Sequence, residues 1–82
     1  MDSGEAIAAT DGGLQKRSMR IAGHRTSLAL EHEFWSALEK IARARNASIP
    51  QLIASVDEQR GKRAPDASLA SAVRVFVLEN RL

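Results

Sequence analysis

The chain of 82 residues contains no cysteine, which excludes disulfide bonds and zinc sites built from thiolates. No apolar run approaches the roughly 20 residues that a membrane-spanning helix needs. The first residues hold neither a basic leader nor an apolar core, so they do not resemble a secretory signal. We therefore predict a single-domain cytoplasmic protein with no membrane partner.

Residues suited to catalysis are also scarce. The chain has two histidines, and His32-Glu33 begins the string of a zinc protease, but no second histidine follows at the required spacing. Neither a glycine-rich phosphate loop nor a nucleophile elbow is present. A chain this short leaves little room for a pocket that buries a substrate. We therefore predict no enzymatic activity, no catalytic residue, no metal site and no cofactor.

Charge is unevenly distributed, although the net charge is only +2. Residues 1–11 carry acidic but no basic side chains, and residues 12–30 carry basic but no acidic ones. A basic segment beside an acidic tail favours a polyanionic partner, and a solvated arm fits the same pattern equally well. The tail, residues 1–15, is predicted to be disordered because it is rich in small and acidic residues. The basic side chains are Lys16, Arg17, Arg20 and Arg25.

The stretch 25–31 is predicted to be a short strand. Apolar and polar side chains alternate in it as in a half-buried strand, with Leu28 and Leu30 on one face. Polar and apolar residues also alternate over 18–21. The strand can therefore begin there, with a bulge or kink at Gly23, or this segment can be an arm that orders on binding. The face opposite the leucines carries Arg25, Ser27 and Ala29.

A lone strand over 26–30 leaves unpaired backbone groups on each edge, and no later segment clearly supplies a partner. The same strand from a second copy, paired antiparallel across a two-fold axis, satisfies one edge of each and buries both pairs of leucines. We therefore predict a homodimer, with Trp35 partly buried at the edge of its core. That core is predicted to contain Leu28, Leu30, Phe34, Trp35, Leu38, Ile41, Leu52, Ile53 and Val56.

Two helices are predicted to follow the strand, from the spacing of their apolar residues. The first covers 31–45 and ends at Asn46, which is expected to adopt the left-handed conformation common at helix C-termini. Ser48 is a good N-cap for the second, and Pro50 lies in its first turn, where a missing N–H costs nothing. This second helix is predicted to end near Arg60.

A third segment is predicted after a basic linker at 61–67. Ser68 is a helix cap, and the apolar residues from Leu69 onward follow a helical stripe to about Asn80. The run 73–77 is rich enough in β-branched residues to be a strand, but the helical pattern is the more complete. The chain is thus divided into a tail (1–15), a core (16–60), the linker (61–67) and a C-terminal helix that packs on the core (68–82).

The order and spacing of these segments resemble those of a known protein family. The strand 26–30, the helix start 31–38, the turn 46–48 and the pair 52–53 are similar to the corresponding parts of ribbon-helix-helix proteins, the fold of small dimeric repressors of bacteria and phages. The Gly-His-Arg-Thr-Ser string at 23–27 resembles a compact bacterial subfamily. The resemblance implies a mainly α fold with one short strand per chain, an intertwined homodimer with an intermolecular two-stranded antiparallel ribbon, and here a C-terminal third helix.

A two-stranded ribbon fits the major groove of DNA, where each base pair shows a distinct pattern of donors and acceptors. The resemblance implies that the outward side chains Arg25, Ser27 and Ala29 contact bases. Ala29 stands where the family usually has a longer polar side chain, and Asn46 where it usually has glycine. Contacts to phosphate are predicted from the basic segment and from free N–H groups at a helix N-terminus, namely Lys16, Arg17, Arg20, Ser48 and Ile49.

The leading hypothesis is a homodimeric transcriptional regulator, a repressor by resemblance, that inserts its ribbon into double-stranded DNA. The alternative is a protein-interaction module in which the ribbon only dimerises and residues 69–82 dock a protein partner. The apolar side chains of that segment exceed what a single buried stripe needs.

Overall fold

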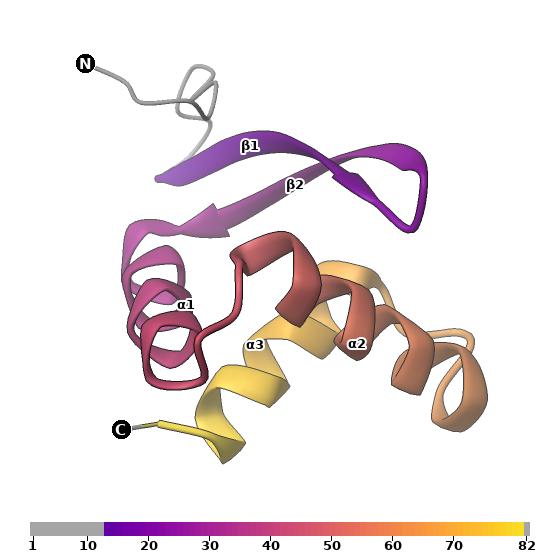
Figure 1. The fold of residues 1–82 in the computed structure, drawn as a ribbon. Coiled ribbons are helices and arrows are strands. Elements are labelled where there is room, and N and C mark those ends of the chain that lie inside the picture. Colours follow the sequence, from indigo (N-terminus) through magenta and orange to yellow (C-terminus); the bar gives the residue numbers. More distant parts are fainter. Residues whose placement is uncertain (1–12, 82) are drawn as a thin grey trace.

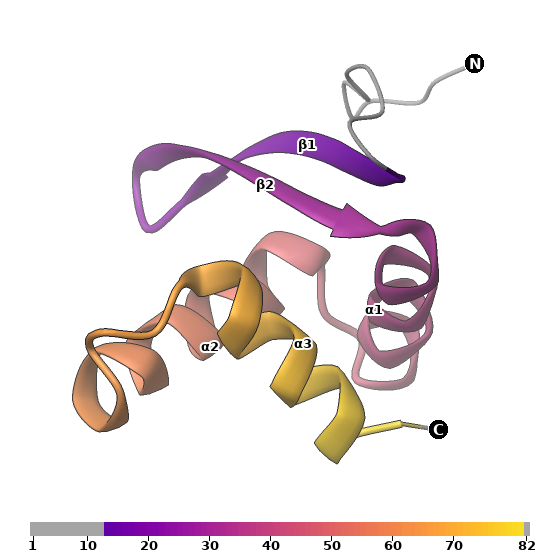
Figure 2. The same ribbon diagram turned by 180° about the vertical axis from the view of Figure 1, so that it is seen from behind.

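The computed structural model describes residues 13–81. In this range the chain forms an antiparallel hairpin followed by three helices, and the hairpin lies across one side of the helical layer (Figure 1). Seen from behind, α3 lies in front of α2, and the hairpin still spans both (Figure 2). The predicted mainly helical fold with an antiparallel ribbon before the helices is confirmed. The elements are β1 (Leu14–Ile21), β2 (His24–Glu31), α1 (His32–Ala44), α2 (Ile49–Arg63) and α3 (Leu69–Glu79).

Both strands of the ribbon come from one chain, which corrects the prediction of one strand per chain. β2 pairs along its whole length with β1, from Ile21 opposite His24 to Leu14 opposite Glu31. The segment left open between a strand extension and an arm is therefore a separate strand, and it occupies the place assigned to a second copy. Residues 14 and 15 of the predicted tail belong to β1, and residues 1–12 lie outside the described part.

The turn between the strands explains the hairpin. Ala22 and Gly23 both have positive φ, 50° and 84°, as a two-residue type I′ turn requires. Gly23 is thus part of a turn and not the bulge or kink that the sequence suggested. An alanine in the left-handed region costs about 1 kcal/mol or more, because its Cβ crowds the following carbonyl oxygen.

Ala22→Asn is expected to raise the free energy of unfolding by about 0.5–1 kcal/mol, because asparagine tolerates positive φ and Asn-Gly is a favoured type I′ pair. Chemical denaturation followed by circular dichroism measures the change. Ala44→Asn is the control, since Ala44 is exposed and its φ is not positive. A lower unfolding free energy for Ala22→Asn would contradict the assigned turn.

The ends of the helices follow the predicted signals. Asn46 has a φ of 54°, the left-handed conformation expected there. At the start of α2, the Ser48 Oγ accepts from the Gln51 N–H at 3.2 Å, and the Ser48 N–H donates to the Gln51 side chain at 2.8 Å. Ser68 caps α3 by accepting a hydrogen bond from the Ser71 N–H. Residues 73–77 lie within α3 and therefore form a helix, as predicted, and not the alternative strand. α2 ends at Arg63 and includes the first three residues of the predicted linker.

One apolar core joins the hairpin to the helices. The largest fully buried side chains are Trp35, Leu30 and Leu38, with others from α2 and α3. Of the residues predicted for a dimer core, all but the half-buried Phe34 are buried within a single chain. β1 makes this possible, because its Met19 and Ile21 cover the surface that a second copy was expected to cover.

Trp35 corrects a second expectation. It was predicted to be partly buried at an edge, but it is 0% exposed. Its indole N–H donates to the Gln15 carbonyl oxygen at 2.9 Å, so it is fixed beneath β1. The sequence pattern placed it beside the apolar stripe of α1 because the covering strand was not foreseen.

Candidate nucleic-acid interface

The face of the hairpin that points away from the helices is built from three cross-strand pairs. In the register of the ribbon, Lys16 lies opposite Ala29, Ser18 opposite Ser27, and Arg20 opposite Arg25. Successive side chains of a strand point to opposite faces, and the residues between these pairs are the ones that face the core. We call these six residues the outer face: Lys16, Ser18, Arg20, Arg25, Ser27 and Ala29.

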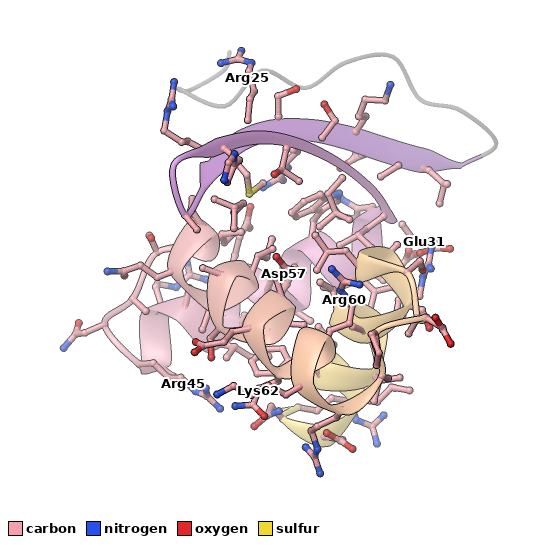
Figure 3. The ribbon with its side chains drawn as sticks, turned by 90° about the vertical axis from the view of Figure 1, so that its right-hand side faces the viewer. Arg25, Glu31, Arg45, Asp57, Arg60 and Lys62 are labelled. Atoms are coloured by element: carbon pink, nitrogen blue, oxygen red, sulfur yellow. The ribbon has the colours of Figure 1, made fainter. Side chains whose placement is uncertain are left out.

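The outer face carries three cations and no carboxylate. Arg20 and Arg25 lie directly opposite each other, an arrangement of like charges that destabilises a ribbon. Arg20 turns back to donate to the Gly23 carbonyl oxygen at 3.1 Å, and Arg25 points away from the helices (Figure 3). Within residues 13–81, neither Arg25 nor Lys16 forms an ion pair. This surface is therefore suited to a polyanion.

The middle of the outer face carries two small polar side chains, and its far end pairs an alanine with a lysine. The hydroxyls of Ser18 and Ser27 lie 3.1 Å apart in a hydrogen bond, and each has further donor or acceptor capacity. Ala29 is half-buried and offers only a methyl group. Lys16, its cross-strand neighbour, supplies a long basic side chain at the same level. The lack of a long polar side chain at Ala29, noted in the sequence, is thus offset by Lys16, whose position beside Ala29 the sequence did not reveal.

Arg17 lies on the other face of the ribbon. It is 7% exposed, its guanidinium stacks over the Trp35 ring at 4.5 Å, and its Nη2 lies 3.3 Å from the Glu39 carboxylate. Such stacking on tryptophan is a favourable cation–π geometry. Arg17 was predicted to contact phosphate, but its side chain extends from β1 to α1 and helps to hold the ribbon on the helices. We remove it from the set of phosphate contacts.

The N-terminus of α2 offers less to a phosphate than predicted. The capping box uses the N–H groups of Ser48 and Gln51, and Pro50 has none. The Ile49 N–H remains in this turn, beside the exposed Ser48 hydroxyl. Because Ile49 itself is 8% exposed, its side chain serves the core, and only its backbone suits the predicted contact.

Glu31 ends the ribbon on the same side as the outer face, and α3 neutralises it. The Arg74 Nε donates to Glu31 Oε1 at 3.0 Å and its Nη2 to Oε2 at 3.3 Å. The hydrogen bond from Arg74 lowers the pKa of the Glu31 carboxyl below its ordinary value of 4.5. The third helix thus removes the effect of an acidic group that would repel an anion. The sequence gave no sign of this pair, whose members are 43 positions apart.

Glu31→Gln is expected to lower the unfolding free energy at neutral pH and to have little effect in strong acid. The depressed pKa means that the Glu31 charge stabilises the folded chain above its ordinary pKa of 4.5, and this contribution is lost as the pH falls through the lower, folded value. Denaturation of both proteins between pH 7 and pH 2 measures the difference. A constant difference at every pH would contradict a role for the Glu31 charge.

A second surface is formed by α2, α3 and the segment between them, without residues of the ribbon. A groove of about 470 Å³ runs between α2 and α3, bordered by Arg63, Val75 and Phe76 among others. Arg60 borders it as well, held by Asp57 at 2.6 Å (Figure 3). Val75 (49% exposed) and Leu78 (57%) are the large apolar side chains left exposed on α3. The other side of this helix carries Val73 and Val77, which are buried in the core.

Other kinds of site find no support in the described residues. No group of three or more metal-ligating side chains occurs among residues 13–81. The three helices of this range also lack the length and the apolar character that a membrane-spanning segment requires.

The comparison with known proteins agrees with this architecture. The family model of the ribbon-helix-helix domain matches residues 14–80, a range that begins with the first residue of β1 and ends just after α3. No curated protein and no solved structure gave a match.

Proposed function

Because the chain belongs to the ribbon-helix-helix domain family, we propose that it is a DNA-binding protein and a transcriptional regulator whose outer face enters the major groove. Domains of this family are typically DNA-binding regulatory domains. The observation that carries the proposal is the outer face itself, with three cations and two hydroxyls on one side of the ribbon, where the nearby Glu31 carboxylate is paired with Arg74. A neutral or mixed-charge face would not favour DNA.

Each part of the outer face suits a known mode of DNA contact. Arg25 can donate two hydrogen bonds to O6 and N7 of a guanine, and Ser27 can bond to several bases. Ala29 can contact a thymine methyl group. Lys16 reaches the flanking backbone, where a lysine acts as a point charge. The Ser48 hydroxyl and the Ile49 N–H are the remaining candidates for a phosphate contact from α2.

A homodimer remains part of the proposal, as do repression, a cytoplasmic location and a bacterial source. Ribbon-helix-helix proteins typically bind DNA as dimers. Leu28 and Leu30, which were expected to pack between the two copies, are already buried within a single chain. Two copies would therefore meet through another surface, or side by side on adjacent half-sites of DNA.

Arg25→Ala is expected to weaken binding to a selected DNA sequence by about 5- to 150-fold, the loss of about 1–3 kcal/mol that follows removal of a bidentate base contact. Fluorescence anisotropy with a labelled duplex at fixed low salt measures the affinity. The control is Arg43→Ala, which removes the same charge from the exposed last turn of α1 and is expected to change affinity little.

Two outcomes would count against the proposal. If the wild-type chain binds no DNA at low salt, the chain is not a DNA-binding protein. If Arg43→Ala and Arg25→Ala weaken binding equally, the outer face is not the contact surface. Folding of each variant is checked by its thermal melt.

The second candidate function is a protein-interaction module that uses α3. It is favoured by the exposed Val75 and Leu78 and by the adjoining groove. Two exposed apolar residues are fewer than an interface core usually contains, and scattered ones are normal on soluble proteins. If the chain binds no DNA, this second candidate becomes the leading proposal. The double variant Val75→Ser, Leu78→Ser then tests it.

A further inference from the structure

We infer that one side of α3, together with the groove between α2 and α3, is the surface through which two copies of this chain contact each other. The inference rests on the homodimer that is part of the proposed function, and it names the contact surface of that homodimer. The residues of this side border or adjoin the groove, and we call them the α3 face: Ser71, Ala72, Val75, Leu78 and Glu79.

The α3 face lies on the side of the helix opposite the buried one. At about 100° per residue its members fall within an arc of about 120°, and Val75 lies at the middle of that arc. Val73 and Val77, on the other side, are 0% and 3% exposed and belong to the core. Val75 and Leu78 are left 49% and 57% exposed, so the α3 face is open to a second molecule.

The spacing of the α3 face suits contact with a copy of itself. If two α3 helices pack antiparallel about a two-fold axis at Val75, residues at equal distances on either side of Val75 meet. Leu78 of one copy then lies over Ala72 of the other, a small and half-buried residue that borders the groove. Each contact occurs twice in such an isologous interface. The two exposed apolar residues of each chain therefore form a cluster of four.

The two ends of the groove carry opposite charges. At the end where α2 passes into α3, Arg60 donates to the Ala67 carbonyl oxygen at 3.0 Å (Figure 3), and Arg63 borders the groove beside it. Glu79 borders the other end, about 12 Å along α3 from Ser71. Within residues 13–81, neither Arg63 nor Glu79 forms an ion pair. Both charges are thus available to a partner.

The antiparallel arrangement brings these unlike charges together. With the axis at Val75, Glu79 of one copy lies opposite Ser71 of the other, at the Arg63 end of that copy's groove. The two-fold axis repeats the contact, so a dimer contains two of them. A parallel arrangement would instead bring like charges together, and a partner of one charge sign would suit only one end of the groove. Charge complementarity therefore favours a second copy of this chain in the antiparallel orientation.

The α3 face is small for an interface. α3 has 11 residues, whereas a stable interface usually involves about 20–30 residues on each side. We therefore expect weak self-association, with a Kd of about 10–100 μM. Exposed ion pairs contribute little to affinity, so an alanine in place of Arg63 is expected to change self-association only slightly. Reversal of a charge is the stronger test, because it replaces attraction by repulsion.

The test measures self-association of the full-length chain by sedimentation equilibrium, at concentrations up to about 1 mM. Arg63→Glu and Glu79→Arg are each expected to weaken the dimer by about tenfold or more, because each creates two contacts between like charges. Leu78→Ser removes an exposed apolar side chain and is expected to weaken it similarly. Arg43→Glu reverses a charge in the exposed last turn of α1 and, as the control, is expected to have little effect.

An equimolar mixture of the Arg63→Glu and Glu79→Arg variants tests the orientation. In a heterodimer, one copy is acidic at both positions and the other is basic at both, so both contacts again join unlike charges. Native mass spectrometry is expected to show more heterodimer than either homodimer, with an affinity within about threefold of the wild type. An effect of either substitution within its own chain would not be relieved by mixing.

The inference is overturned if the wild type stays monomeric at every concentration, which would leave the α3 face to a different protein. It is also overturned if the charge reversals leave the dimer intact, or if the mixture associates no better than the separate variants. Thermal melts check that each variant folds. DNA binding by the wild type is measured separately by fluorescence anisotropy. Its absence would overturn the proposed function, whereas the result of mixing would still decide the inference.

Discussion

Trp35→Ala is expected to lower the free energy of unfolding by about 3–5 kcal/mol, the usual cost of truncating a buried aromatic side chain. Trp35 is 0% exposed, it bonds to the backbone of β1, and the guanidinium of Arg17 covers its ring. A domain of this size is stabilised by only a few kcal/mol. We therefore expect the variant to be largely unfolded at room temperature, as measured by circular dichroism and by urea denaturation.

The neighbouring aromatic residue provides the control. Phe34→Ala removes a half-buried ring from the same turn of α1 and is expected to cost clearly less. If Trp35→Ala costs no more than Phe34→Ala, then Trp35 lies at an edge of the core and β1 does not cover it. The comparison thus tests the position of β1 without reference to DNA.

The helical part of the fold was predictable from the sequence because its signals are local. Ser48 and Ser68 mark the helix starts, and both side chains accept the expected backbone N–H. Asn46 marks the end of α1 by its left-handed conformation. Even the ambiguous run 73–77 was assigned correctly to a helix, because its apolar residues recur with a helical period.

The hairpin could not be predicted with the same rules, because its turn is poorly marked. A two-residue type I′ turn is usually recognised by Asn-Gly or Asp-Gly, and here the first position is Ala22. The alternation in β1 is also obscured, because Arg17 takes an inward position where an apolar residue is expected. Its stacking on Trp35 makes that position tolerable, and this contact joins residues 18 positions apart.

The candidate site was accordingly half predicted. The outward residues of β2 followed directly from the period of the strand. The contribution of β1 depends on the register of the hairpin, which pairs Lys16 with Ala29 and Arg20 with Arg25. The Ser48 end of α2 was located correctly, but its free donors were overestimated because the Gln51 side chain occupies one of them.

Removing all three cations of the outer face, by Lys16→Ala, Arg20→Ala and Arg25→Ala together, is expected to lower DNA affinity by about 1,000-fold. The estimate assigns about tenfold, or about 1.4 kcal/mol, to each contact. If all three cations also neutralise phosphates, the slope of log affinity against log salt falls by about 2.7. Affinities measured over a series of salt concentrations give both values.

The fold should survive this triple change. Arg20 and Arg25 lie opposite each other with like charges, so their removal relieves a repulsion in the free chain. We therefore expect an unfolding free energy equal to or above that of the wild type, together with the loss of DNA binding. Functional sites of natural proteins often contain residues that lower stability but are needed for activity. A variant that is at least as stable as the wild type but no longer binds DNA would therefore identify the outer face as a surface selected for an anionic partner.

The matched control removes one lysine and two arginines from exposed positions on the helices, as Lys40→Ala, Arg43→Ala and Arg63→Ala. It has the same net charge as the outer-face variant, so long-range attraction to DNA is reduced equally. A loss of affinity and of salt slope confined to the outer-face variant indicates direct contact by the ribbon. Equal losses in the two variants would mean that only the total charge of the chain matters, and the ribbon would then have no special place in binding.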